Sequence, residues 1–184
     1  YVTFTPGNGF YADLSYRAMD FDGSGEGGQT TFGYEGSANG YNLEFGYGYK
    51  TSSGWIIEPQ LQWSSVSVDL DSFNYQLSDF RLDDGDSSLL RIGAAFRKNY
   101  ETSGGHSWTP YAALSYLDET SGTNSYVISN VLTGDVDTSG ASALLELGAT
   151  AFIKEWGVSA GLNWRDGSAY DSVLGGQLSV RYDW

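Results

Sequence analysis

The chain has 184 residues, which favours a single domain, and its 23 acidic and 9 basic residues give a formal net charge of −14. This acidity excludes nucleic acid as a partner, and the lack of cysteine excludes disulfide bonds and thiolate metal sites. The longest apolar run, residues 111–114, is too short for a transmembrane helix. The sequence begins at Tyr1 without Met or a leader-like segment, so we expect a mature or cropped piece of a protein.

Apolar and polar residues alternate with a period of two in eight segments. This period predicts β-strands, because successive side chains of a strand point to opposite faces. In chain order, the segments are residues 10–19, 41–49, 55–64, 90–97, 108–116, 145–153, 156–165 and 175–184. We interpret residues 1–8 as a tail or as the remnant of a preceding strand. The alternation breaks between Ser65 and Val66, where we expect a β-bulge.

Each predicted strand has one apolar and one polar face. Such strands are typical of transmembrane β-barrels, whose apolar face contacts lipid while polar side chains line the interior. We therefore predict one domain over residues 1–184 with an all-β fold, an antiparallel up-and-down transmembrane β-barrel with eight strands in this chain. The predicted outward residues include Leu14, Phe45, Leu61, Ile92, Leu114, Leu147, Val158 and Val180. The predicted lumen-facing residues are Asp13, Arg17, Glu44, Glu58, Gln60, Arg91, Arg97, Glu146 and Arg181.

The connections between the strands alternate in length. Residues 6–8, 51–54, 101–107 and 154–155 form the short connections, and residues 20–36, 69–88, 117–139 and 165–174 form the long ones. Outer-membrane barrels have short periplasmic turns and longer extracellular loops. The pattern thus predicts a Gram-negative outer membrane location, with a periplasmic C-terminus and extracellular long loops.

The long connections contain 16 acidic and 2 basic residues, which account for the whole net charge of the chain. An acidic rim of this kind could attract divalent cations where the barrel meets lipopolysaccharide. Ordinary solvation of polar loops explains the same charge and is the interpretation that we favour. The lipid bilayer and lipopolysaccharide are the expected surroundings of the barrel.

All six tryptophans lie on the predicted apolar face, towards the strand ends. Indole is apolar with one polar group, so it settles at the membrane–water interface and forms girdles. The predicted girdle consists of Trp55, Trp63, Trp108, Trp156, Trp164 and Trp184.

Two features point weakly to metal binding or catalysis. Residues 20–25 (DFDGSG) match the start of a calcium-binding loop, but the twelfth position is Thr31 instead of a bidentate Glu, and we interpret the segment as a flexible loop. His106 is the only histidine and lies in a short turn, without a carboxylate in a defined relation to it. Inward carboxylates have arginines with which to pair. We therefore expect no enzymatic activity, no metal and no cofactor.

Four segments are more specific: WIIEPQLQW (55–63), SSLLRIGAAF (87–96), WTPYAALSYLDE (108–119) and the terminal LSVRYDW (178–184). In these segments the chain resembles the translocator β-barrel of autotransporters, the type V secretion proteins of Gram-negative outer membranes. The resemblance runs from about residue 9 to residue 184 and covers the last eight of the family's twelve strands. It implies that the parent protein exports its own N-terminal passenger. It also implies that the β-barrel assembly machinery recognises the terminal strand.

Two other interpretations stay open. A complete eight-stranded barrel would act as a membrane anchor or surface-loop adhesin, and a membrane enzyme would need catalytic groups that the loops hardly supply. A sheet in lipid cannot leave unpaired edges. Eight strands would close around a filled interior, whereas twelve would leave a pore. We favour an incomplete barrel; a backbone ladder between residues 11–17 and residues 177–182 would favour the closed form.

Overall fold

The computed structural model describes residues 1–27, 30–82, 85–102, 104–168 and 171–182, and every regular element in these segments is a β-strand. The strands are β1 (Val2–Phe4), β2 (Phe10–Gly27), β3 (Thr30–Tyr47), β4 (Tyr49–Lys50), β5 (Trp55–Leu70), β6 (Phe73–Tyr75), β7 (Ser78–Leu82), β8 (Gly85–Lys98), β9 (Tyr100–Thr102), β10 (His106–Ser121), β11 (Thr123–Ile128), β12 (Leu132–Asp137), β13 (Gly140–Ile153), β14 (Trp156–Gly167) and β15 (Val173–Tyr182). None of the described segments forms a helix long and apolar enough to cross a membrane.

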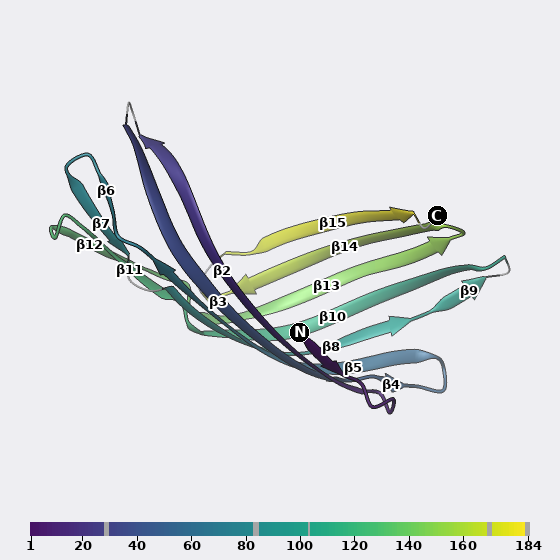
Figure 1. The fold of residues 1–184 in the computed structure, drawn as a ribbon. Coiled ribbons are helices and arrows are strands. Elements are labelled where there is room, and N and C mark those ends of the chain that lie inside the picture. Colours follow the sequence, from purple (N-terminus) through teal and green to yellow (C-terminus); the bar gives the residue numbers. More distant parts are fainter. Residues whose placement is uncertain (28–29, 83–84, 103, 169–170, 183–184) are drawn as a thin grey trace.

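Eight long strands form an antiparallel meander, in which each strand pairs with the next long strand along the chain (Figure 1). Their order is β2-β3-β5-β8-β10-β13-β14-β15, with β1 on the outer edge of β2. The short strands β4 and β9 pair with β5 and β10 at one end of the sheet. The predicted all-β, up-and-down architecture is confirmed, and each of the eight predicted strands corresponds to one long strand.

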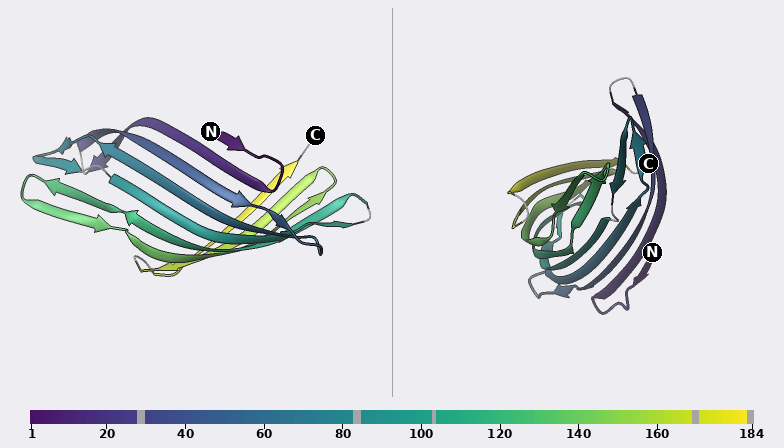
Figure 2. Two further views of the ribbon diagram at one scale, coloured as in Figure 1. Left: turned by 90° about the horizontal axis from the view of Figure 1, so that it is seen from below. Right: turned by 90° about the vertical axis from the view of Figure 1, so that its left-hand side faces the viewer.

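The sheet is curved into a trough (Figure 2), and its two faces differ in exposure. On β10, Leu114 and Tyr116 on the convex face are 59 % and 52 % exposed, while Ser115 and Leu117 on the concave face are 3 % and 4 % exposed. The predicted outward residues that are exposed are Leu14, Phe45, Leu61, Ile92, Leu114, Leu147 and Val180. Val158 is half-buried beside its register partners Ala151 and Val180.

Within the described part of the chain, the sheet is open. The free side of β2 is partly covered by β1, through the register Val2↔Leu14 to Phe4↔Ala12, so residues 2–4 form a short strand within the segment that we interpreted as a tail or a remnant. On the far side, β15 pairs with β14. No ladder joins the described residues of β2 and β15. The described residues thus do not form the ladder that would favour a closed eight-stranded barrel.

The loop predicted over residues 20–36 is wrong, because β2 and β3 continue as a regular ladder from Asp20↔Ser37 to Gly27↔Thr30. Glycines at positions 23 and 25 suggested a flexible loop, since glycine weakens strands. In the structure, the rings of Tyr34 and Phe32 lie over Gly23 and Gly25, where a Cβ would overlap them. Aromatic rings that cover cross-strand glycines stabilise such a ladder.

The β-bulge predicted between Ser65 and Val66 is also wrong. β5 keeps a continuous register with β3 and β8 through both residues. The side chains change character there because Val66, Val68 and Leu70 face a cavity of about 400 Å³ that is also lined by Leu82. A register shift occurs instead on β10, between Glu119 and Ser121.

Two of the predicted long loops contain a second sheet of four strands, ordered β12-β11-β7-β6. Its hairpin β6–β7 packs on β3 through stacked rings: the centroids of Phe73 and Phe32 are 5.2 Å apart, and those of Phe73 and Phe80 are 5.1 Å apart. This smaller sheet lies at the end of the trough opposite to β4 and β9 (Figure 1).

Candidate functional site

The concave face carries a hydrogen-bonded polar network across β2, β3 and β5. The Tyr11 hydroxyl donates to Glu44 Oε1 at 2.7 Å and lies 3.2 Å from Glu58 Oε1. Gln60 Nε2 donates to Glu58 Oε1 at 2.8 Å and to the Tyr11 hydroxyl at 3.2 Å. These residues come from different strands, so the network crosslinks the wall through side chains.

Glu58 is the most buried carboxylate that the structure describes on this face, with 6 % of the residue exposed. A buried carboxylate is costly unless it is paired and hydrogen-bonded. The Arg97 guanidinium supplies the counter-charge, with Nη2 2.8 Å from Glu58 Oε2. Tyr11 and Gln60 occupy the other carboxylate oxygen.

A second network links β8, β10 and β13. Arg91 Nη2 lies 2.8 Å from Glu146 Oε2, and Arg91 Nε donates to Ser115 Oγ at 2.9 Å. Both charged side chains are partly buried, at 24 % and 32 % exposure. The ion pair therefore holds three neighbouring strands together on the concave face.

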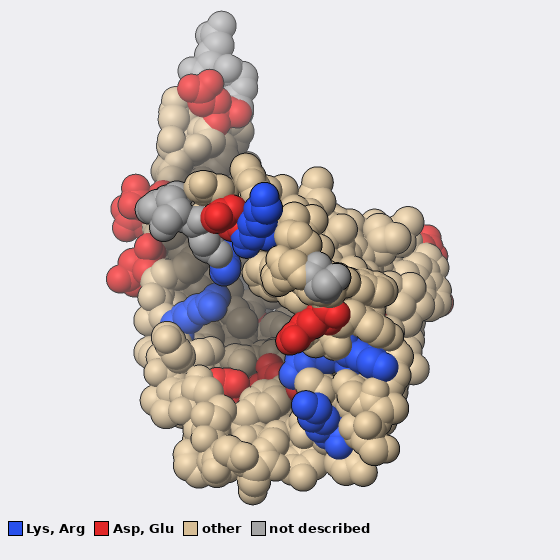
Figure 3. Space-filling model, turned by 90° about the vertical axis from the view of Figure 1, so that its right-hand side faces the viewer, with Lys and Arg blue, Asp and Glu red and all other residues tan. Residues whose placement is uncertain are grey.

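The remaining predicted lumen residues lie at the margins of the sheet. Asp13 accepts a hydrogen bond from the Thr3 hydroxyl of β1. Arg17 is exposed and pairs in register with Gly40 on β3. The Arg181 guanidinium lies over the Phe152 ring, 5.8 Å from its centroid. Figure 3 looks into the hollow of the trough, where acidic and basic side chains gather.

Two tyrosines on the concave face fill space above glycines of the neighbouring strands. The Tyr11 ring lies over Gly46, its register partner, where a Cβ would overlap the ring. Tyr111 lies in the same way over Gly148 and Gly161, where added Cβ atoms would be 2.6 Å and 2.8 Å from it. The sequence predicted that these two rings lie on the polar face, but it did not predict that they pack over glycines. A glycine opposite an inward-facing tyrosine indicates such packing once the strand register is known.

The convex face carries aromatic residues in two bands. Trp55 and Trp63, Trp108 and Tyr116, and Trp156 and Trp164 are each eight positions apart and all exposed. At about 3.3 Å per residue and a tilt of about 40°, eight positions cover about 20 Å across a membrane, close to the ~25 Å apolar band of outer-membrane barrels. The predicted girdle residue Trp184 lies outside the described residues.

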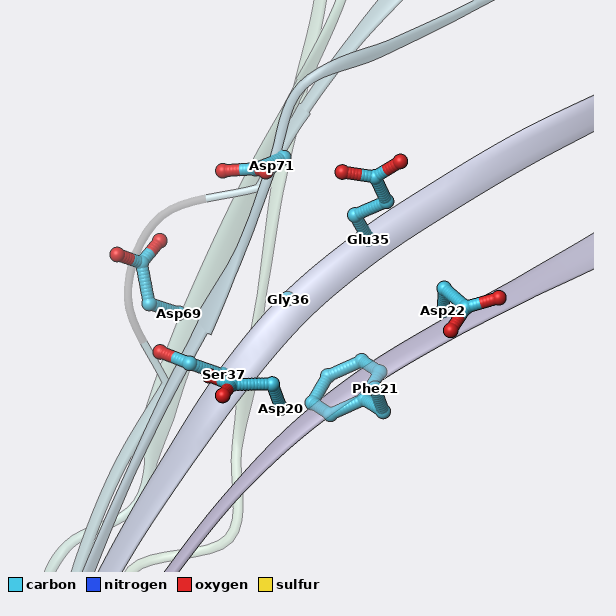
Figure 4. Close-up of a pocket in the computed structure, with 8 residues that line it drawn as sticks. All are labelled: Asp20, Phe21, Asp22, Glu35, Gly36, Ser37, Asp69 and Asp71. Atoms are coloured by element: carbon cyan, nitrogen blue, oxygen red, sulfur yellow. The ribbon is translucent and has the colours of Figure 1, made fainter.

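Acidic side chains line a cavity of about 560 Å³ near the far ends of β2, β3 and β5 (Figure 4). They are Asp20, Asp22, Glu35, Asp69 and Asp71. Asp22 and Glu35 are direct register partners, and like charges opposite each other destabilise a ladder. In Figure 4 the carboxylates spread over the strands, and the described residues contain no cluster arranged to hold a metal ion.

Two other polar groups, His106 and Asp137, lie outside the trough. His106 lies at the start of β10, and its buried Nδ1 has no hydrogen-bond partner among the described residues. At the end of β12, hydrogen bonds from Ser139 lower the pKa of the Asp137 carboxyl, which therefore stays charged. Among the described residues, His106 Nδ1 therefore activates no nucleophile, and Asp137 bonds to Ser139 only two positions further along the chain.

The chain is similar to known proteins over nearly its whole length. Residues 1–180 match the family model described as the autotransporter β-domain. Over 157 residues the chain is 31 % identical to the pertactin autotransporters of Bordetella parapertussis and Bordetella bronchiseptica. The alignment covers 82 % of this chain and 17 % of each relative, so the chain spans about a sixth of their length.

The crystal structure of the β domain of the Bordetella autotransporter BrkA shares the fold, with a TM-score of 0.68 at 20 % identity. That match covers 99 % of this chain and 70 % of the BrkA chain.

Proposed function

Because the chain belongs to the autotransporter β-domain family, we propose that it forms part of the barrel through which its parent protein exports an N-terminal passenger. Autotransporter β domains are β-barrels of the Gram-negative outer membrane. In this proposal the domain anchors the parent protein and lines the export path. It is a transport domain without catalytic activity.

The observation that carries the proposal is the two-faced wall. Its convex face is apolar and bounded by aromatic bands suited to a bilayer. Its concave face carries Glu58, Arg97, Arg91 and Glu146 in hydrogen-bonded pairs. A wall of this kind separates lipid from a hydrated interior, which is what an export channel requires.

The open edges support a barrel that needs further strands. An unpaired N–H or C=O costs several kcal/mol in the apolar membrane core, and the described parts of β2 and β15 do not pair with each other. The chain covers 70 % of the BrkA β domain that shares its fold. We propose that additional strands of the parent protein complete the wall and widen it to a pore.

The orientation follows from the two ends of the trough. We propose that the end with the tight turns, such as the one between β13 and β14, faces the periplasm together with the C-terminus. The four-stranded sheet and the acidic cavity would then face outward, next to lipopolysaccharide. The β-barrel assembly machinery is the proposed partner during insertion, through the terminal strand.

Passage of the passenger through the trough can be tested by photo-crosslinking in Gram-negative cells that express the full-length protein. A benzoylphenylalanine at Gln62, on the concave face, should crosslink to the passenger during export. The same group at Leu61, on the convex face, is the matched control and should not. Equal crosslinking from both positions, or export without crosslinking at Gln62, would contradict the proposal.

The orientation can be tested with cysteine labelling, since the chain contains no native cysteine. Leu77, between β6 and β7, is fully exposed, and Glu155 lies in the turn between β13 and β14. In intact cells, a membrane-impermeant maleimide should label Leu77→Cys and spare Glu155→Cys until the outer membrane is permeabilised. Labelling in the opposite order would invert the proposed orientation.

A further inference from the structure

An apolar groove lies on the wall where β5 begins and β8 ends. Its volume is about 430 Å³, and it is lined by Trp55, Phe96, Pro110, Tyr111 and Ala112. Phe96 and Ala112 are register partners, so the small side chain of Ala112 leaves space beside a large ring. The groove lies within the aromatic band near the starts of β5, β10 and β14, which includes Trp55, Trp108 and Trp156.

A lysine lies next to Trp55, one of the residues that line this groove. Lys98 is the register partner of Trp55, so both side chains are on the same face of the sheet. Lys98 Nζ lies 5.9 Å from the Trp55 ring centroid and 5.0 Å from that of Tyr100. The Tyr100 ring in turn stacks on Trp108 at 4.8 Å. The two rings hold the ammonium group by cation–π contacts.

The positive charge of Lys98 has no carboxylate partner among the described residues. The ion pairs among the described residues are formed by other basic side chains, those of Arg81, Arg91 and Arg97. Glu101, the nearest acidic residue along the chain, is one position past Tyr100 on β9, and it accepts a hydrogen bond from Asn99. An ammonium group at a membrane interface without a counter-charge favours an anion from the surroundings.

We propose that Lys98, the two rings beside it and the groove form a binding site for an anionic phospholipid. The headgroup phosphate binds Lys98 Nζ, and one acyl chain lies along Phe96, Pro110 and Ala112. This inference rests on the proposed orientation, in which this rim faces the periplasm and its phospholipid leaflet. A free phosphate would contact the ammonium and leave the groove empty, whereas a phospholipid fills both.

Native mass spectrometry of the full-length protein, extracted from outer membranes, tests the site. The protein is exposed to equal amounts of phosphatidylglycerol and phosphatidylethanolamine, and the retained lipid is identified. One favourable lysine–lipid contact predicts a preference of about fivefold for phosphatidylglycerol. Lys98→Gln should abolish this preference, and Lys98→Arg should keep it.

Two further variants separate the headgroup contact from the groove. Lys154→Gln removes a charge from the β13–β14 turn at the same rim, where the lysine has no ring contact like those of Lys98 among the described residues, and should leave the preference unchanged. Ala112→Phe fills the groove and should reduce retention of both lipids. The proposal is overturned if Lys98→Gln retains the wild-type preference, or if soluble glycerol phosphate competes as well as the phospholipid does. Passenger display by the same cells is measured in parallel, so loss of lipid preference with normal display separates this site from the export function.

Discussion

The Glu58 carboxylate, with only 6 % of its residue exposed, lies 2.8 Å from the Arg97 guanidinium, whose side chain is 45 % exposed. Removing one partner of a fully buried ion pair costs about 3–5 kcal/mol, because the other charge is left uncompensated. Since Arg97 is partly solvated, we expect Arg97→Gln to lower the free energy of unfolding by about 2 kcal/mol. The urea midpoint of the membrane-extracted protein measures this change.

The matched control for that variant is Arg81→Gln, which removes an exposed ion pair with Asp79 on the four-stranded sheet. Exposed pairs contribute about 0–1 kcal/mol, so the midpoint should hardly move. The double variant Glu58→Gln/Arg97→Gln should recover part of the loss. Equal effects of the Arg97 and Arg81 variants would show that the pair in the trough does not stabilise the wall.

Because the Tyr11 ring packs over Gly46, we expect Gly46→Ala to be destabilising. The added Cβ overlaps the ring, which must move and lose its hydrogen bond to Glu44. Overpacking of this kind costs about 1–3 kcal/mol. Gly40→Ala on the same strand is the control, because its Cβ would meet Val66 at an ordinary 3.7 Å. The thermal unfolding curves of the two variants should differ. Identical curves would show that the contact between the Tyr11 ring and Gly46 does not contribute to stability.

The convex face predicts a large difference between two arginine substitutions on β13. Leu147→Arg places a charge on the convex face near mid-membrane and should destabilise the folded protein by about 2–4 kcal/mol. Thr150→Arg, three positions along and on the concave face, should cost much less. Denaturant unfolding in lipid vesicles compares them. Similar losses would contradict the assignment of the two faces.

The sequence also predicts a kinetic effect of the last residue. Trp184→Ala should slow assembly into the outer membrane while leaving the finished barrel nearly as stable, because an aromatic residue at the end of the last predicted strand serves recognition as well as interfacial anchoring. Pulse-chase measurement of the folded, heat-modifiable form in cells gives the rate. Equal assembly rates for the variant and the wild type would contradict a role of Trp184 in recognition during assembly.

The long strands could be predicted because alternation is a local property. Residues 10–19 already show this alternation, and in the structure they pair with residues 38–47 in a continuous register. The extension of the β2–β3 hairpin could not be predicted, because Gly23 and Gly25 on their own indicate an interruption of the strand. Only the structure shows that the rings of Tyr34 and Phe32 cover these glycines. The four-stranded sheet was missed because its strands are short and lie in acidic segments.

The candidate site was predictable in part. Alternation assigns Glu58, Arg97, Arg91 and Glu146 to the polar face, and it also assigns Trp55 and Trp63 to the apolar one. It does not indicate which charges meet, because Glu58 contacts Arg97 only through the register of β5 with β8. The position of Lys98 between two aromatic rings also depends on β9, a strand of three residues that carries no alternation signal.

The most direct test of the two-faced wall uses adjacent residues midway between Trp156 and Trp164. Ser159 and Ala160 on β14 are both small and, in the structure, point to the concave and convex faces. The full-length protein is spin-labelled at Ser159→Cys or Ala160→Cys in outer-membrane vesicles, and collision rates with oxygen and with a water-soluble nickel complex are measured. Ala160→Cys should collide mainly with oxygen, as a lipid-facing site does, and Ser159→Cys mainly with the nickel complex. The same accessibility at both positions, or the reverse order, would contradict a wall between lipid and a hydrated interior.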